Sequence, residues 1–195
     1  AGTYSVQGVP GTQSTTENNA NAAGWTLAVV YADPLQKSRN LSIFVGAELT
    51  SSSTGSSTAA VTGFGTPITG TVNGRLLVSA IEGDSAIVGD QLQFGPTVAA
   101  LQPVSGPNNP VNNFFASQIN NDSGVLDTSG QFGSLNSTPG GSLSGARQGR
   151  DITNIDVSAR LSNNQTSAVV RGTTSGDTYV ISALALQVDI NAPVL

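Results

Sequence analysis

Short runs in which apolar and polar residues alternate recur along the chain, and turn-forming residues separate them. This two-residue periodicity predicts β-strands, because successive side chains of a strand point to opposite faces of a sheet. Helices are not expected, since 23 glycines and 9 prolines interrupt almost every window long enough to form one. The expected strands are residues 3–6, 25–31, 39–45, 61–71, 74–82, 90–94, 151–157, 165–172 and 179–189, with a weaker candidate at 98–101.

The strongest of these strands is Trp25–Tyr31, a run of aromatic and β-branched residues that is typical of the centre of a sheet. We expect a turn at Asp33, and residues 39–45 are expected to form the return strand. The last strand, residues 179–189, is expected in the same sheet as this first strong one. Because Trp25 lies within the run, its ring is expected in the core.

Long segments rich in Gly, Ser and Asn separate the strands. Residues 48–60 fit either a polar strand pair or a loop, and residues 113–119 fit either a strand or a helical turn. Residues 102–113 and 130–149 are expected to be loops. The whole pattern predicts an all-β fold, an antiparallel two-sheet β-sandwich that is jelly-roll-like, with long Gly/Ser/Asn-rich loops. We expect it to form a single domain over residues 1–195.

The composition removes several classes of chemistry. Without cysteine or histidine, the chain has no thiolate, no Ser-His-Asp site, and none of the usual ligands of zinc and copper. The net charge of −5 opposes binding to nucleic acid, which depends on Lys and Arg neutralising phosphates. No apolar run reaches the roughly 20 residues of a membrane helix.

The charged fraction is also low, at 10% of residues, whereas Ser, Thr, Asn, Gln and Gly are abundant. This balance is typical of proteins that face the medium, so we expect an extracellular or cell-surface location. Residues 1–6 have the pattern of a strand interior. We therefore expect the domain to be part of a larger or processed extracellular protein.

Several segments together resemble an adhesin-like domain of large bacterial and archaeal cell-surface proteins of unknown function. They are Gly24–Pro34 (GWTLAVVYADP), Arg39–Gly46 (RNLSIFVG), Glu82–Asp84 with Gly89–Asp90, Asn112–Phe115 (NNFF), Gly149–Ser158 (GRDITNIDVS) and Thr174–Tyr179 (TSGDTY). In that family an Asp often stands where this chain has Val45, so a role of that Asp would be missing here. The resemblance implies display on a surface or in a fibre rather than catalysis.

Three acidic residues are the best candidates for a binding site. Glu82, Asp84 and Asp90 flank the glycines between two expected strands. Their carboxylates can supply part of the roughly 6–8 oxygen ligands that calcium requires. The alternative, which we favour, is that these acids form turns and accept hydrogen bonds from backbone N–H groups. Calcium is therefore the one candidate cofactor, although the spacing matches no EF-hand loop.

Other candidate residues have a favoured structural explanation. Arg150 with Asp151 and the nearby Asp156 is expected to hold a buried ion pair rather than a second metal, since an unpaired buried charge is costly. The aromatic residues that could stack on glycans are Trp25, Tyr31 and Tyr179.

Lys37, the single lysine, would need an apolar strand to form an isopeptide bond, and its turn sequence predicts exposure instead. Paired carboxylates could serve a glycosidase, but no pair stands out. We therefore expect no enzyme.

Two hypotheses about function follow. The first is a non-catalytic structural or adhesive module, either an adhesin domain or a self-assembling fibre or layer subunit. Its partners would be other copies of itself or neighbouring surface-protein domains, joined through an open sheet edge. The second is a calcium-dependent module that binds glycans or another surface. Neither hypothesis involves nucleic acid or a membrane span.

Overall fold

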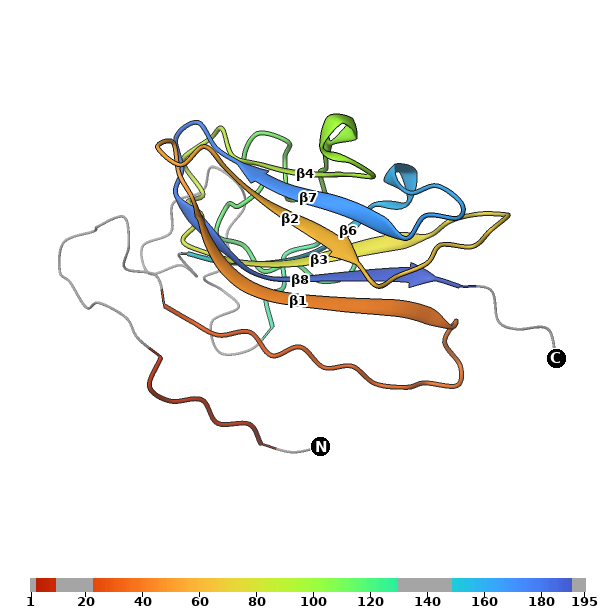
Figure 1. The fold of residues 1–195 in the computed structure, drawn as a ribbon. Helices are drawn as coiled ribbons and strands as arrows, with labels where there is room; N and C mark the ends of the chain where they lie inside the picture. Colours follow the sequence, from red (N-terminus) through yellow and green to blue (C-terminus); the bar gives the residue numbers. More distant parts are fainter. Residues whose placement is uncertain (1–2, 10–22, 130–148, 191–195) are drawn as a thin grey trace.

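The computed structural model describes residues 3–9, 23–129 and 149–190, which form a sandwich of two β-sheets (Figure 1). The strands are β1 (Arg39–Thr50), β2 (Ser56–Thr62), β3 (Gly74–Ile81), β4 (Gln91–Gly95), β5 (Gln102–Pro103), β6 (Arg150–Asp156), β7 (Ser167–Thr173) and β8 (Tyr179–Asp189). Two short 3-10 helices, η1 (Val98–Ala100) and η3 (Ser158–Arg160), lie in the connections. No helix among the described residues is both long and apolar enough to cross a membrane.

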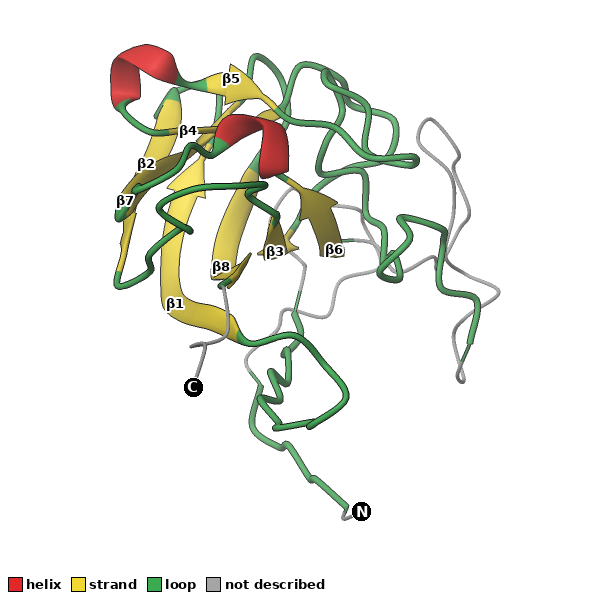
Figure 2. Ribbon diagram, turned by 90° about the vertical axis from the view of Figure 1, so that its right-hand side faces the viewer, coloured by secondary structure: helices red, strands yellow, loops and turns green. Residues whose placement is uncertain are grey.

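Sheet A has the strand order β1-β8-β3-β6, and sheet B has the order β2-β7-β4-β5. All neighbouring strands in both sheets are antiparallel. Figure 1 shows β2, β4 and β7 as one layer above β1, β3 and β8, and Figure 2 shows the same two layers from the side. The predicted all-β, antiparallel two-sheet sandwich is confirmed. Successive strands change sheet except at β4–β5, and the jelly-roll-like arrangement stays a prediction.

The core fills the space between the two sheets. Successive side chains point to opposite faces of a strand, so alternate residues of each strand face inward. Two neighbouring phenylalanines from the β5–β6 connection complete the core, although they belong to neither sheet. The buried apolar residues include Leu76, Val78, Leu184, Leu186 and Val188 from sheet A, Val61, Leu92, Phe94, Ala168 and Val170 from sheet B, and Phe114 and Phe115.

Most of the predicted strands are present. The expected strands at residues 39–45, 74–82, 90–94, 151–157, 165–172 and 179–189 correspond to β1, β3, β4, β6, β7 and β8. The Ser- and Thr-rich residues 48–60 contain the end of β1, a turn at residues 51–55 and the start of β2. The loop predicted at residues 130–149 lies outside the described residues except for Gly149.

Four shorter predictions are wrong. The strand predicted at residues 61–71 stops at Thr62, because the chain turns at Gly63 with a φ of 80°. Residues 98–101 contain η1 instead of a strand. Residues 113–119 form neither a strand nor a helix, and residues 3–6 pair with none of the strands that the structure describes.

The largest departure from prediction concerns residues 23–31, here called the strap. The strap belongs to neither sheet, and Figure 1 shows it running beneath β1 on the side away from sheet B. Trp25 is 49% exposed and Tyr31 is 75% exposed, so the predicted central strand and the predicted core position of Trp25 are both wrong. The strand that pairs with β8 at this edge is β1. Strong β-propensity shows that a segment can pair, but it does not identify the partner.

The packing makes a direct prediction about stability. Leu186 lies on β8 and is 0% exposed, so Leu186→Ala is expected to lower the free energy of unfolding by about 2–5 kcal/mol. Leu35→Ala removes the same atoms from a residue that is 90% exposed, and should change stability by less than about 0.5 kcal/mol. Urea unfolding followed by circular dichroism measures both. Equal effects of the two substitutions would contradict the core described above.

Candidate functional site

The strand register brings three parts of the chain together at one end of the sandwich. Ile81, at the end of β3, pairs with Val180 on β8 and with Arg150 on β6. Gln91, at the start of β4, pairs with Thr173 at the end of β7. The β3–β4 and β7–β8 connections therefore begin and end on neighbouring strands, and the first residues of β6 lie beside them.

Three carboxyl groups meet where these connections approach each other. Glu82 and Asp84 come from the β3–β4 connection, and Asp177 comes from the β7–β8 connection. One carboxylate oxygen of each residue lies within 4.8 Å of the other two. The backbone N–H of Asp84 also donates a hydrogen bond to Asp177 Oδ2 at 3.0 Å. The structure thus brings together two of the residues singled out for calcium, with Asp177 in the position expected for Asp90.

Asp90 and Asp151 are more buried than Glu82 and Asp84 of this outer group, at 0% and 2% exposure, and Asp177, its third member, is 1% exposed. Asp90 Oδ2 accepts a hydrogen bond from Phe115 N at 2.6 Å, and Asp151 Oδ1 accepts one from Gln118 N at 3.0 Å. The two carboxylates therefore hold the same stretch of the β5–β6 connection. The Phe115 ring packs against the Tyr179 ring with 4.1 Å between ring centroids, which closes the core next to the acids. We call Glu82, Asp84, Asp90, Asp151 and Asp177 the acid group.

Burial and mutual repulsion favour the neutral forms of these acids. Burial, with the charges of Asp84 and Asp177, raises the pKa of Glu82 to about 8. Burial is also the main cause that raises the pKa of Asp177 to about 7, against hydrogen bonds from Asp84 N and Thr178 N.

The pKa values of the two deeper acids are raised as well, again mainly by burial. For Asp151 the hydrogen bond from Gln118 N opposes this effect, whereas the charges of Asp90 and Asp177 add to it. Each acid therefore lies within electrostatic reach of others in the group.

Unsatisfied polar atoms are concentrated at the same place. Within the described residues, buried side-chain nitrogen and oxygen atoms without a hydrogen-bond partner all come from the β3–β4 connection, residues 113–120 or the start of β6. They are Glu82 Oε2, Asp90 Oδ1, Asn113 Oδ1, Gln118 Oε1 and Nε2, Asn120 Oδ1, Arg150 Nη1 and Asp151 Oδ2. Native interiors leave few such atoms, because each costs about 1–3 kcal/mol and a charged group costs more.

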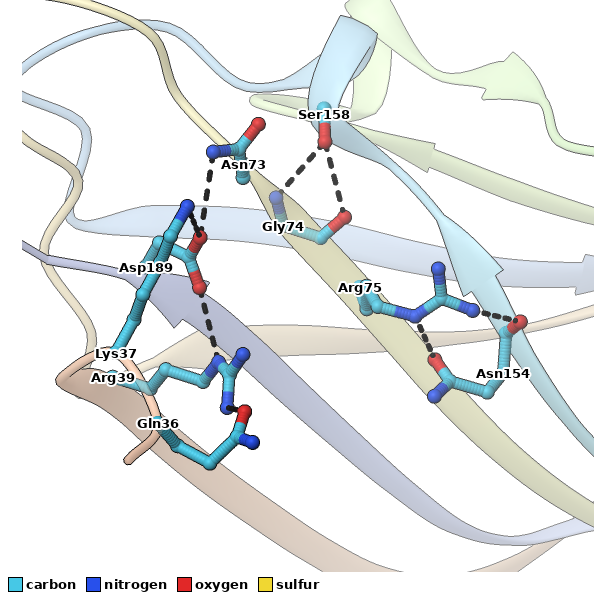
Figure 3. Close-up of polar contacts among 9 residues, drawn as sticks. All are labelled: Gln36, Lys37, Arg39, Asn73, Gly74, Arg75, Asn154, Ser158 and Asp189. Atoms are coloured by element: carbon cyan, nitrogen blue, oxygen red, sulfur yellow. Dashed lines mark hydrogen bonds and ion pairs between the residues drawn. The ribbon is translucent and has the colours of Figure 1, made fainter. Parts of the chain in front are cut away.

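Two ion pairs lie at the opposite end of β8. There Lys37 Nζ and Arg39 Nε contact Asp189 at 3.4 and 3.0 Å (Figure 3). Asn73 Nδ2 donates to the same carboxylate at 3.3 Å, and Arg75 Nε donates to Asn154 Oδ1 at 2.9 Å. Lys37 and Arg39 thus neutralise the charge of Asp189.

The predicted ion pair between Arg150 and Asp151 is not formed. The two residues are adjacent on β6, so their side chains leave opposite faces of sheet A. Arg150 Nη2 instead donates to Trp25 O at 2.8 Å and to Thr26 Oγ1 at 2.9 Å. Asp156 is also separate from both, since it lies at the far end of β6, where hydrogen bonds from Ser158 lower its pKa.

Arg150 holds one end of the strap against the outer face of sheet A. Thr26 Oγ1 also lies 2.8 Å from Ser79 Oγ on β3. Beyond Thr26 the chain leaves a hollow of about 670 Å³ between itself and the sheet. The strap side of this hollow includes Leu27 and Val29, and the sheet side includes Leu41, Ile43, Leu77 and Ala185.

Side-chain exposure tests two further candidates, the nucleophilic role of Lys37 and the stacking of aromatic residues on glycans. The Lys37 side chain is 70% exposed, as its turn sequence predicted, so it lacks the desolvation that a nucleophilic lysine requires. Tyr179 is 0% exposed and cannot stack on a glycan. Trp25 and Tyr31 lie on the strap and are accessible.

Asp177 is the member of the outer group that the pattern of acids did not single out. A signal was available, because the sequence contains three Gly-Asp pairs, at Asp84, Asp90 and Asp177. All three join the acid group. Recognising this required the information that β3 pairs with β8 and β4 with β7, which no local pattern provides.

A search of protein-family models, curated proteins and solved structures finds no match to the chain. The resemblance to adhesin-like surface domains stays a prediction. A function can therefore be inferred only from features of the described structure, namely the acid group, the strap and the edge strand β1 of sheet A.

Close packing around the acid group can be tested at Gly83. A Cβ atom at this position would lie 2.5 Å from Asp151 Oδ2 and would also collide with Phe115 O. Gly83→Ala is therefore expected to destabilise the fold by about 1–3 kcal/mol. Gly46→Ala is the matched control, because a Cβ there meets nothing within 4 Å. Thermal unfolding compares the two, and a neutral Gly83→Ala would show that the acid group is looser than described.

Proposed function

We propose that this chain is a non-catalytic structural module of the cell exterior that associates with other copies of itself. The observation that carries the proposal is the strap, an uncharged and largely apolar segment that is exposed and belongs to neither sheet. Val29 is 62% exposed and Val30 is 60% exposed, in addition to Trp25 and Tyr31. Contiguous exposed apolar surface of this kind marks an interaction site.

The backbone of the strap supports pairing with another strand. Residues 23–31 carry no charged side chain, so their burial in an interface would leave no unpaired charge. Their N–H and C=O groups take part in neither sheet. An extended apolar segment whose backbone lies outside the sheets can add to the edge of a sheet, where backbone hydrogen bonds provide affinity and side chains provide specificity.

The edge strand β1 is a suitable acceptor. It is 12 residues long, and β8 is its only sheet neighbour in the described chain. Its charged residues, Arg39 and Glu48, lie near its ends, whereas Ile43 is 45% and Val45 is 85% exposed between them. Proteins that avoid edge pairing place charges or prolines on such strands, and the centre of β1 has neither.

A second copy of the chain is the occupant that fits these features. Each copy carries both the donor, the strap, and the acceptor, β1 with the apolar outer face of sheet A beside it. Such head-to-tail contacts repeat from copy to copy and generate a fibre or layer when they do not close. The low content of charged residues limits repulsion between copies, and the resemblance to surface adhesins agrees with an extracellular location.

Light scattering over a concentration series, with negative-stain electron microscopy of the same samples, tests self-association. Val29→Asp is expected to weaken it by roughly 10- to 100-fold, because a buried valine contributes about 1.5–3 kcal/mol. Thermal stability of the single copy should not change, since the side chain is exposed.

Ile68→Asp is the matched control, because Ile68 is 77% exposed on the β2–β3 connection. It should leave self-association unchanged. A parent protein that stays a single copy at millimolar concentration, or equal effects of the two substitutions, would contradict the proposal.

Glycan binding is the second candidate function, and the exposure of Trp25 and Tyr31 on one segment favours it. Aromatic rings of this kind stack on sugars and combine an apolar face with a polar edge. If glycans are the ligands, a glycan array should show binding that Trp25→Ala abolishes. Binding that is retained by Trp25→Ala, or absent from the parent protein, would eliminate this candidate.

A further inference from the structure

We propose that the hollow between the strap and sheet A binds one long-chain carboxylate, that is, a free fatty acid. The hydrocarbon chain of the ligand would lie between the strap and the sheet, and its carboxylate would lie beside Arg75 and Arg39, which line the hollow. The hollow belongs to a single copy of the chain, so this inference does not depend on self-association.

The strap is joined to the sheet at two places, and the hollow lies between them. Near its start, Thr26 Oγ1 lies 2.8 Å from Ser79 Oγ on β3. After residues 32–38 the chain enters β1 at Arg39. The hollow of about 670 Å³ falls within the roughly 300–1,000 Å³ of small-molecule sites. The strap therefore forms one wall of a site of ligand size, and the outer face of sheet A forms the other.

Both walls of the hollow carry apolar side chains. On the sheet, Ala185 of β8 pairs with Ile43 of β1 and with Leu77 of β3, so these three residues form one row across three strands. Ile43 is 45% exposed and Leu77 is 39% exposed. Leu27 and Val29 line the strap side. A hydrocarbon chain placed here would remove from water the apolar surface that the protein leaves exposed.

Positive charge lies toward one end of this hollow. One row further along β8, Gln187 pairs with Arg75, and in the row after that Asp189 pairs with Arg39. Both arginines line the hollow together with Lys37, so three of the seven basic residues of a chain with a net charge of −5 gather here. An apolar stretch that ends in cations matches a ligand with a hydrocarbon chain and one anionic group.

Acidic residues offset only part of this charge. Asp189 contacts both Lys37 and Arg39, at 3.4 and 3.0 Å, so one carboxylate is shared by two cations (Figure 3). Of the described residues that line the hollow, three are basic and one, Asp33, is acidic. Asp33 Oδ1 accepts a hydrogen bond from Leu35 N at 2.9 Å in the turn that follows the strap. The lining therefore has a net positive charge, which attracts an anionic headgroup.

Arg75 is well placed to hold that headgroup. Its Nε and Nη2 atoms donate to Asn154 Oδ1 and Asn154 O, both at 2.9 Å, and Nη2 also donates to Asp122 O. These acceptors are neutral oxygens, and a carboxylate is a stronger acceptor for a guanidinium. Hydrogen bonds from Ser158, with a smaller contribution from the charge of Arg75, lower the pKa of Asp156. The bonds to Asn154 hold the guanidinium beside the hollow before a ligand arrives.

Isothermal titration of the full chain at low micromolar concentration tests the site. The ligands are octanoate, decanoate and 1-decanol, the last of which has the chain length of decanoate but no charge. Decanoate is expected to bind with one molecule per chain. Each methylene added from octanoate to decanoate should strengthen binding by about 4-fold. 1-Decanol should bind at least about 10-fold more weakly than decanoate, because it lacks the charge-assisted hydrogen bonds.

Arg75→Gln is expected to weaken decanoate binding by roughly 10- to 100-fold and to leave 1-decanol binding unchanged. A purely structural role of Arg75 would weaken both ligands equally. Arg171→Gln is the matched control, because Arg171 lies on sheet B and donates to Gln93 Oε1 at 2.9 Å, as Arg75 donates to Asn154 on sheet A. Arg171→Gln should keep the parent affinity for decanoate.

Ala185→Phe places a ring in the hollow and should abolish binding of both decanoate and 1-decanol. Ala99→Phe is its control, because Ala99 is exposed on η1, and it should bind both ligands as the parent does. Circular dichroism verifies that each variant is folded. If Ala185→Phe does not fold, the comparison of Arg75→Gln with Arg171→Gln still decides the question.

Light scattering of the same proteins separates this inference from self-association. Self-association without decanoate binding would overturn the ligand site and leave the proposed function standing, whereas decanoate binding by a permanent single copy would do the reverse. Equal affinities for decanoate and 1-decanol, or an Arg75→Gln variant that binds decanoate as the parent does, would overturn the carboxylate assignment. Binding to phosphatidylglycerol vesicles without binding of free decanoate would also overturn the proposal, since the partner would then be a membrane surface.

Discussion

The pairing of β3 with β8 is the contact on which the rest of the structure depends. These two strands form the centre of sheet A, and their register places Leu76 opposite Leu186 and Val78 opposite Leu184. The same residues supply the inner face of the sheet, so this pairing also fixes one wall of the core. Because the strands are antiparallel, the end of β3 lies beside the start of β8. The acid group is the direct consequence, since both connections at that end carry acids.

The two ends of β8 differ in how they balance charge. At its last residue, the Asp189 carboxylate forms ion pairs with Lys37 and Arg39 and accepts a hydrogen bond from Asn73. At its first residues the acids meet other acids, and the nearest arginine on β6 turns to the opposite face of the sheet. The fold tolerates this arrangement through backbone hydrogen bonds and raised pKa values.

Much of the fold follows from the sequence alone, because sandwich strands are short and have a two-residue period. β3, β6 and β8 were located within about one residue. The inward-facing residues of β3 and β8 are mostly apolar, whereas β6 turns Asp151 and Thr153 inward beside Ile155. The same rule failed for the strap, because the segment Trp25–Tyr31 has the composition of a buried strand. An apolar composition indicates that a segment is stabilised by packing against another surface, but that surface need not belong to the same chain. The failure therefore identified the segment on which the proposed function rests.

The acid group shows the complementary limit of sequence analysis. Glu82 and Asp84 could be singled out from the sequence because they are close together in it, whereas Asp177 is brought to them by strand pairing alone. The placement of Arg150 beside Asp151 on β6 has a similar cause. Adjacent residues on a strand face opposite sides, so one strand carries an acid toward the core and an arginine toward the strap. Arg150 holds Trp25 through a backbone oxygen and Thr26 through a hydroxyl group. The start of the strap is therefore fixed without using its apolar side chains, and these remain free to contact a partner.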